Sequence, residues 1–191
     1  MAITINGNGT VTGISVGGLP DGIVDTDTLA VGNRGKVLQI VFASKTDVSS
    51  AFSSLAWSDT GLTATITPTS SSNKILIQAK PCLSWDNGMS KVACALFKDS
   101  GTDPILRSDA RGNRQRVHQG WYEPSNSFVG FPFSLDCLDS PNTTSPTAYK
   151  VKVSALDDTG SVYMNRGSDY DNDQTNHMSQ VSTITLMEVA G

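Results

Sequence analysis

The sequence carries little charge, few aromatic residues and no long apolar run. Only 17% of its 191 residues are charged, 7% are aromatic, and the formal net charge is -4 at pH 7. Proteins that bind nucleic acid generally present a basic surface, so this balance argues against general affinity for DNA or RNA. The chain also lacks a run of about eighteen apolar residues, which argues against a membrane-spanning helix. Its first residues have neither the basic nor the apolar region of a secretory signal, so we expect none.

Cysteine is scarce as well. Cys82, Cys94 and Cys137 form an odd set without a C-x-x-C pair. This pattern indicates neither a disulfide framework nor a zinc ribbon. We interpret the three residues as small buried apolar side chains on strands. A bridge between Cys82 and Cys94 across a hairpin is the alternative, which a reducing assembly compartment disfavours.

No segment shows a sustained helical stripe with caps, whereas strand-like segments punctuated by proline and glycine fill the chain after Gly35. These segments are rich in β-branched residues, or alternate apolar with polar side chains. We predict strands over residues 37–42, 62–67, 74–80, 91–97, 128–137, 147–155, 161–164 and 181–189. Many short strands at this spacing indicate an all-β protein, a sandwich or jelly roll.

The first part of the chain has a different composition, rich in glycine, aspartate and threonine, with its apolar residues alone or in pairs. Such a segment buries too little apolar surface to become ordered alone. We therefore predict an N-terminal arm over residues 1–34 and a β-sandwich over residues 35–191. The arm residues expected to mediate attachment or trimer formation are Gly13, Val16, Gly17, Gly18, Leu19, Pro20, Ile23 and Val24. Winding with copies of itself would satisfy the arm's backbone groups, and a disordered tail is the alternative.

Several blocks of this sequence resemble a known group of proteins. They are residues 13–30, 35–39, 59–77, 138–151, 163–166 and 182–189. Together the blocks resemble small tail-fibre and virion-surface proteins of marine and cyanobacterial tailed bacteriophages, whereas residues 99–129 match nothing in that group. The resemblance implies a jelly-roll domain, homotrimeric around a threefold axis and displayed on the virion, with no catalytic residue to transfer. It also implies synthesis in the bacterial host cytoplasm and release by lysis.

Basic residues are concentrated in one short segment. Arg107, Arg111, Arg114 and Arg116 lie within ten residues, and His118 follows closely. One interpretation is a site for an anionic partner, such as a lipopolysaccharide phosphate or an acidic sugar. The alternative, to which we give more weight, is a solvated or subunit-spanning loop that pairs with carboxylates.

Aromatic residues beside polar groups suggest a second kind of contact. Trp121 and Tyr122 follow the basic segment, and Trp85 precedes Asp86, all in expected loops. Such rings can stack on sugar faces, although tryptophans of this kind more often fill a core or an interface. We therefore place the candidate receptor contact between Arg107 and Tyr122.

The sequence offers little for metal binding or catalysis. Alternating carboxylates at Asp169, Asp171 and Asp173 suggest a calcium loop with Asp157 or Asp158, but Gln174 and Gln180 stand where an EF-hand needs glycine and glutamate. A polar turn is the simpler reading, and we expect no metal or other cofactor. Nucleophile elbow, P-loop and H-E-x-x-H motifs are absent, so we expect no enzyme activity.

These observations favour a non-enzymatic virion protein, a trimeric tail or baseplate fibre whose sandwich binds a host-surface glycan. Its expected partners are copies of itself and other phage structural proteins, without nucleic acid or membrane insertion. The alternatives are a trimeric capsid decoration or cement protein, a polysaccharide depolymerase built largely from loop aspartates, and a host-encoded lectin-like module.

Overall fold

The computed structural model describes residues 36–86, 91–122, 130–156, 160–168 and 178–191. Contacts within the chain divide it into two units, Met1–Lys36 and Val37–Gly191. The predicted boundary after residue 34 lies two residues before this division. The predicted arm, with its eight candidate residues, lies outside the described residues.

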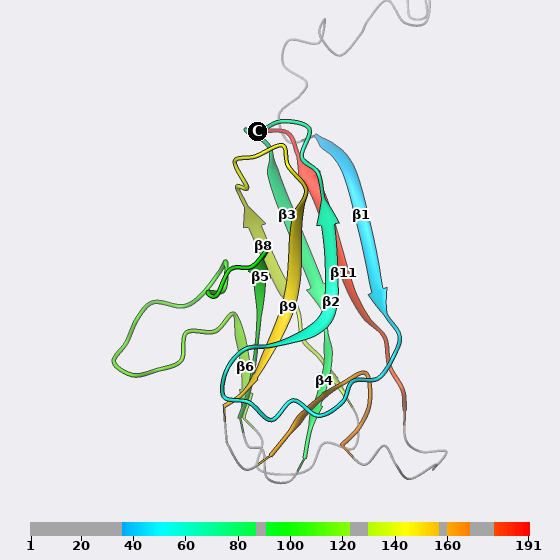
Figure 1. The fold of residues 1–191 in the computed structure, drawn as a ribbon, viewed down its shortest axis with the longest axis vertical. Helices are drawn as coiled ribbons and strands as arrows, with labels where there is room; N and C mark the ends of the chain where they lie inside the picture. Colours follow the sequence, from blue (N-terminus) through cyan, green and yellow to red (C-terminus); the bar gives the residue numbers. More distant parts are fainter. Residues whose placement is uncertain (1–35, 87–90, 123–129, 157–159, 169–177) are drawn as a thin grey trace, which may run out of the picture. The chain divides into compact units, whose positions relative to one another are not determined.

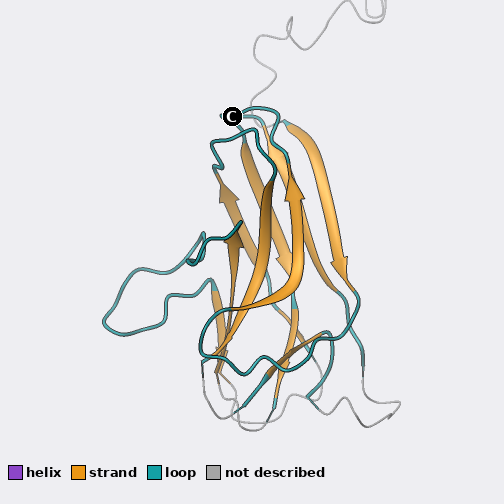
Figure 2. Cartoon of the chain, in the orientation of Figure 1, coloured by secondary structure: helices purple, strands orange, loops and turns teal. Residues whose placement is uncertain are grey.

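The described part of the chain is all-β and contains no helix, as the sequence predicts. Its strands are β1 (Val37–Lys45), β2 (Ser58–Ile66), β3 (Lys74–Lys80), β4 (Cys82–Trp85), β5 (Lys91–Lys98), β6 (Gln119–Tyr122), β7 (Phe131–Pro132), β8 (Leu135–Asp139), β9 (Thr147–Ala155), β10 (Val162–Met164) and β11 (Ser182–Val189). They form antiparallel sheets in the orders β1-β11-β3-β8, β2-β9-β5-β6 and β10-β4-β7. Figures 1 and 2 show these strands as two facing layers.

Alternation of apolar and polar residues explains how the two four-stranded sheets pack as a β-sandwich. In β2, Leu62, Ala64 and Ile66 are buried while their neighbours are exposed, because successive side chains point to opposite faces. In β11, Ile184 and Leu186 alternate in the same way. Residues of both sheets join one hydrophobic cluster, which is the core between the layers.

A proline interrupts the first layer. Pro81 separates β3 from β4, and it cannot donate a backbone hydrogen bond to a ladder. Its carbonyl instead accepts a hydrogen bond from the Phe133 amide at 2.9 Å, at the gap between β7 and β8. The small β10-β4-β7 sheet therefore begins where the ladder of β3 and β8 ends.

Some predictions of local structure were wrong. Trp85 lies on β4 with 1% of its surface exposed, and Trp121 and Tyr122 lie on β6, although loops were expected for all three. The strand predicted over 128–137 is divided into β7 and β8. The other predicted strands over described residues are present within a few residues of their expected ends.

A buried carboxylate forms a hydrogen-bond network at one end of the β1-β11-β3-β8 sheet. Glu188 on β11 is fully buried and accepts hydrogen bonds from Asn73 Nδ2 at 2.6 Å, from Gln39 Nε2 at 2.6 Å, and from the amide and hydroxyl of Thr69 at 2.6 and 2.8 Å. Burial raises the pKa of this carboxyl group, but the hydrogen bonds outweigh burial and lower the pKa to about 2. The network connects β1, β11 and the turn between β2 and β3.

All three cysteines are buried and unpaired, as the sequence analysis favours. Cys82 lies on β4, Cys94 on β5 and Cys137 on β8. Burial raises the pKa of each thiol, so each is protonated at neutral pH. The alternative bridge between Cys82 and Cys94 is not formed.

Candidate functional site

The basic segment lies in the long connection between β5 and β6, residues 99–118, which projects from the sandwich (Figure 1). The connection is anchored where it leaves β5. The Asp99 amide donates to the Ala148 carbonyl at 2.8 Å, and the Asp99 carboxylate accepts from the Ala148 amide at 2.8 Å. The Ile105 amide donates to the Leu96 carbonyl at 2.9 Å. This anchoring fixes the base of the loop and directs residues beyond Ile105 away from the sheet.

A hollow of about 340 Å³ lies between this loop and the residue that precedes β2. Its described lining consists of Trp57, Asp103, Pro104, Arg107, Gly112, Asn113, Arg114, Gln115 and Arg116. Three of these residues are arginines and one is an aspartate, so the lining carries a net positive charge. Arg107, Arg114 and Arg116, which lie close together in the sequence, all line this hollow.

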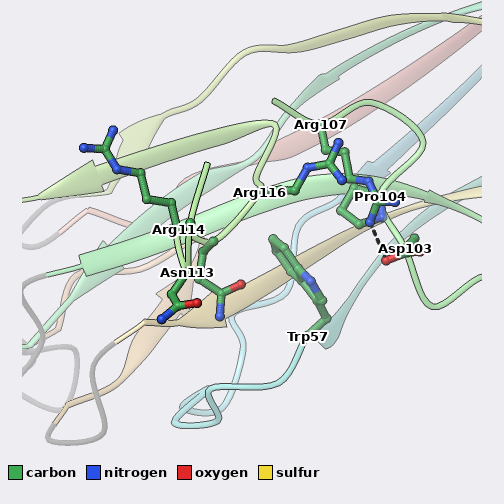
Figure 3. A pocket seen from close by; sticks show the side chains of 9 residues that line it. Trp57, Asp103, Pro104, Arg107, Asn113, Arg114 and Arg116 are labelled. Atoms are coloured by element: carbon green, nitrogen blue, oxygen red, sulfur yellow. Dashed lines mark hydrogen bonds and ion pairs between the residues drawn. The ribbon is translucent and has the colours of Figure 1, made fainter. Parts of the chain in front are cut away.

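Hydrogen bonds orient two of the three arginines. Arg107 forms an ion pair with Asp103, with Nη1 and Oδ1 2.7 Å apart, and Arg116 Nε donates to the Ser108 carbonyl at 2.6 Å. Figure 3 shows both side chains on the Trp57 side of the loop, whereas the Arg114 guanidinium points away from them. Arg107 and Arg116 are thus the arginines that face the hollow together.

Trp57 forms the aromatic wall of the hollow. Its ring packs edge-on against Phe97 of β5, with ring centroids 5.2 Å apart. Lys152 Nζ lies 4.6 Å from the centroid of the same Phe97 ring. Phe97 is completely buried, so Trp57 rests on a rigid part of the sheet while remaining partly exposed itself. Trp57 was not among the site residues predicted from the sequence, and it lies far from the arginines along the chain.

The hollow combines guanidinium groups with a flat apolar ring. Guanidinium groups bind carboxylates and phosphates through paired hydrogen bonds, and an aromatic face packs against the apolar face of a sugar. Among the described lining residues Asp103 is the single carboxylate, and it pairs with Arg107. The arrangement is therefore suited to binding an acidic sugar and offers no second carboxylate for acid–base work.

The remaining candidates of the basic segment lie apart from this lining. Arg111 is exposed but does not line the hollow. Burial lowers the pKa of His118 despite the opposing charge of Asp136 on β8, so its imidazole is neutral at pH 7. Its Nδ1 atom is buried and has no hydrogen-bond partner in the described structure. His118 is accordingly placed toward the sandwich.

Trp121, unlike its neighbour Tyr122 on β6, belongs to a separate aromatic stack. Trp121 stacks on Phe131 of β7 with centroids 6.3 Å apart, and Phe131 stacks on buried Trp85 at 5.4 Å. Strands β6 and β7 each lie at the end of their sheet, so this stack connects the two layers along one side. Trp121 and Tyr122 remain about half exposed or more, at 49% and 64%.

No group of potential metal ligands occurs among the described residues. The calcium-loop candidates Asp157, Asp158 and Asp169 to Asp173, with Gln174, lie outside them. Within the described ranges there is also no helix long and apolar enough to cross a membrane.

No model of a protein family matches the chain, and no curated protein sequence matches it.

Proposed function

We propose that this chain is a structural protein of a bacteriophage virion, a trimeric tail or baseplate fibre whose β-sandwich binds an acidic glycan on the host surface. The observation that carries the binding role is the hollow in which Arg107 and Arg116 face Trp57. The virion setting rests on the resemblance of the sequence blocks. The protein acts by binding in this proposal, with no chemical step and no cofactor.

We assign the sandwich to the jelly-roll class. A jelly roll behaves as one long antiparallel hairpin rolled into two sheets, so that the first strand pairs with the last and the innermost strands pair with each other. The pairs β1–β11, β2–β9, β3–β8 and β5–β6 follow this nested order when β4 and β7 extend β3 and β8. This pairing supports the assignment.

The binding role is tested with variants of the full chain against oligogalacturonate and phosphorylated lipopolysaccharide core, with uncharged dextran as comparison. Arg107→Ala and Arg116→Ala each remove a guanidinium that faces Trp57, so we expect affinity to fall about tenfold to a hundredfold. Arg111→Ala is the matched control, because it removes the same charge outside the lining. Binding in the wild type should also weaken with added salt.

Two results would overturn the binding role. One is equal affinity for dextran and the acidic ligands. The other is the same loss in Arg111→Ala as in Arg116→Ala, which would indicate general charge attraction and no defined site.

The virion role has a separate test. Quantitative proteomics of purified particles should find the chain at tens of copies per particle, as expected for a fibre. Hundreds of copies would favour the capsid decoration alternative, and absence from particles would refute both. Cleavage of host polysaccharide by the purified chain would favour the depolymerase.

A further inference from the structure

The outer face of the β1-β11-β3-β8 sheet carries an apolar row that crosses all four strands. Ile40 pairs with Met187, Met187 with Leu76, and Leu76 with Leu138 in the strand registers. Ile40 is 62% exposed and Leu138 is 55% exposed, and the two residues between them are partly exposed. Directly paired residues have neighbouring side chains, so the four side chains form one continuous surface feature, here called the apolar row.

Strand β1 widens the apolar row. Phe42 lies two residues beyond Ile40, shares its face and is 61% exposed. The intervening Val41 and residue Ala43 pack against the core, which confirms that this face of β1 points outward. Monomeric proteins rarely expose large contiguous apolar patches, and larger ones generally mark contact sites.

The opposite outer face of the sandwich is covered by the chain itself. Ala93, Ala95 and Phe97 point outward from β5, yet all three are completely buried. Trp57 and the connection after β5 lie over this side. Among the described residues, the chain thus covers the apolar outer face of the β2-β9-β5-β6 sheet. The apolar outer face of the β1-β11-β3-β8 sheet stays exposed and is here called the bare face.

We propose that copies of this chain cover the bare face, with the apolar rows of three copies packed around the threefold axis of the trimer. This inference deepens the trimer in the proposed function and rests on it. Each residue near a symmetry axis meets its own copies, so a charged row would repel itself. The apolar row contains no charged residue.

Charge and size at this face also suit contact between copies. The outward charges beside the apolar row are Lys74 and Lys80 on β3 and Asp136 on β8, so each copy offers both signs at the margin. The four strands β1, β11, β3 and β8 have 9, 8, 7 and 5 residues. At ordinary strand rise and spacing their outer face covers roughly 460 Å² in projection. Accessible area exceeds projected area, so the face approaches the roughly 800 Å² per partner of a stable interface.

The test measures the mass of the full chain by light scattering and analytical ultracentrifugation over a wide concentration range. We expect a trimer in the wild type. Leu138→Glu places three like charges at the proposed axis and should raise the dissociation constant at least about a hundredfold. Leu55→Glu is the matched control because Leu55 is equally exposed at 55%, while its carbonyl accepts a hydrogen bond from Ser154 on the opposite sheet. It should leave the mass unchanged.

Ile40→Glu repeats the test from the other end of the apolar row, and circular dichroism checks that each variant is folded. A wild-type trimer that persists in both folded row variants would overturn this inference while leaving the trimer intact. A wild type that stays monomeric would overturn both the inference and the proposed trimer, and another molecule or segment would then cover the face. Equal dissociation in Leu55→Glu would also contradict the proposal.

Discussion

The outer faces of the two large sheets carry the same kind of side chain in very different surroundings. Phe97 on β5 points outward and is completely buried beneath Trp57, whereas Phe42 on β1 points outward and is 61% exposed. Both follow the same strand alternation, so the difference arises from what the intervening connections cover. The comparison shows that one sheet face is completed within the chain and also supplies the wall of the candidate site. The other face is left for a partner in our proposal.

The largest expected effect is a difference in the free energy of unfolding between a variant of the covered face and a variant of the bare face. Phe97→Ala removes a buried ring and leaves a cavity beneath Trp57, so the free energy of unfolding should fall by about 3–5 kcal/mol. Phe42→Ala removes the same atoms from the bare face and should change the stability of the dissociated chain by less than about 1 kcal/mol. Urea unfolding at low protein concentration measures both. Equal losses would mean that Phe42 is covered within a single chain.

The next effect concerns the contribution of Glu188 to the stability of the β1-β11-β3-β8 sheet as the pH changes. The folded pKa of Glu188 is about 2 and its ordinary value is 4.5, so the carboxylate contributes stability above pH 4.5. That contribution is lost as the pH falls from 4.5 toward 2. Its size is on the order of 3 kcal/mol, from the size of the pKa difference.

Glu188→Gln removes this titration. The variant should be less stable than the wild type at pH 7, because the amide cannot accept hydrogen bonds from all its present donors. The two proteins should approach each other in stability near pH 2. Unfolding curves recorded across this range measure the effect, and Glu123→Gln serves as a control for loss of a negative charge. A constant difference between wild type and Glu188→Gln at every pH would contradict the assigned role.

The smallest expected effect on stability comes from an ion pair in the loop over the covered face. Asp103 and Arg107 form an ion pair near the surface, which contributes about 0–1 kcal/mol. Asp103→Asn should therefore change the free energy of unfolding very little. It frees the Arg107 guanidinium for a ligand anion, so affinity for oligogalacturonate should rise severalfold, as measured by calorimetry. Weaker binding would show that Asp103 orients Arg107 productively.

Alternation made most of the fold predictable. Segments such as β2 and β11 alternate apolar and polar residues over most of their length, so their sequences identify both the strand and its buried face. Strand β4 was missed because all four of its residues are buried, which leaves no alternation, and because Pro81 suggests a break before it. Strand β6 was missed because it contains no β-branched residue and includes Gly120.

The candidate site was predictable only in part. The arginines are close in sequence, so their charge could be recognised as local. Trp57 reaches them only because the edge-on contact with Phe97 brings two distant parts of the chain together. The one signal in the sequence is a tryptophan directly before a strand, which does not specify its neighbours. The apolar row depends on the strand order of a sheet, which alternation within single strands does not determine.

The buried thiols can report how readily the strands around them open. Cys94 lies in the sheet that the chain covers, Cys137 lies in the bare one, and each can be alkylated only when its own strand opens. The order in which a thiol reagent labels them therefore ranks the local opening of the two layers. Slower labelling of Cys137 as the protein concentration rises would report assembly on the bare sheet without any engineered probe.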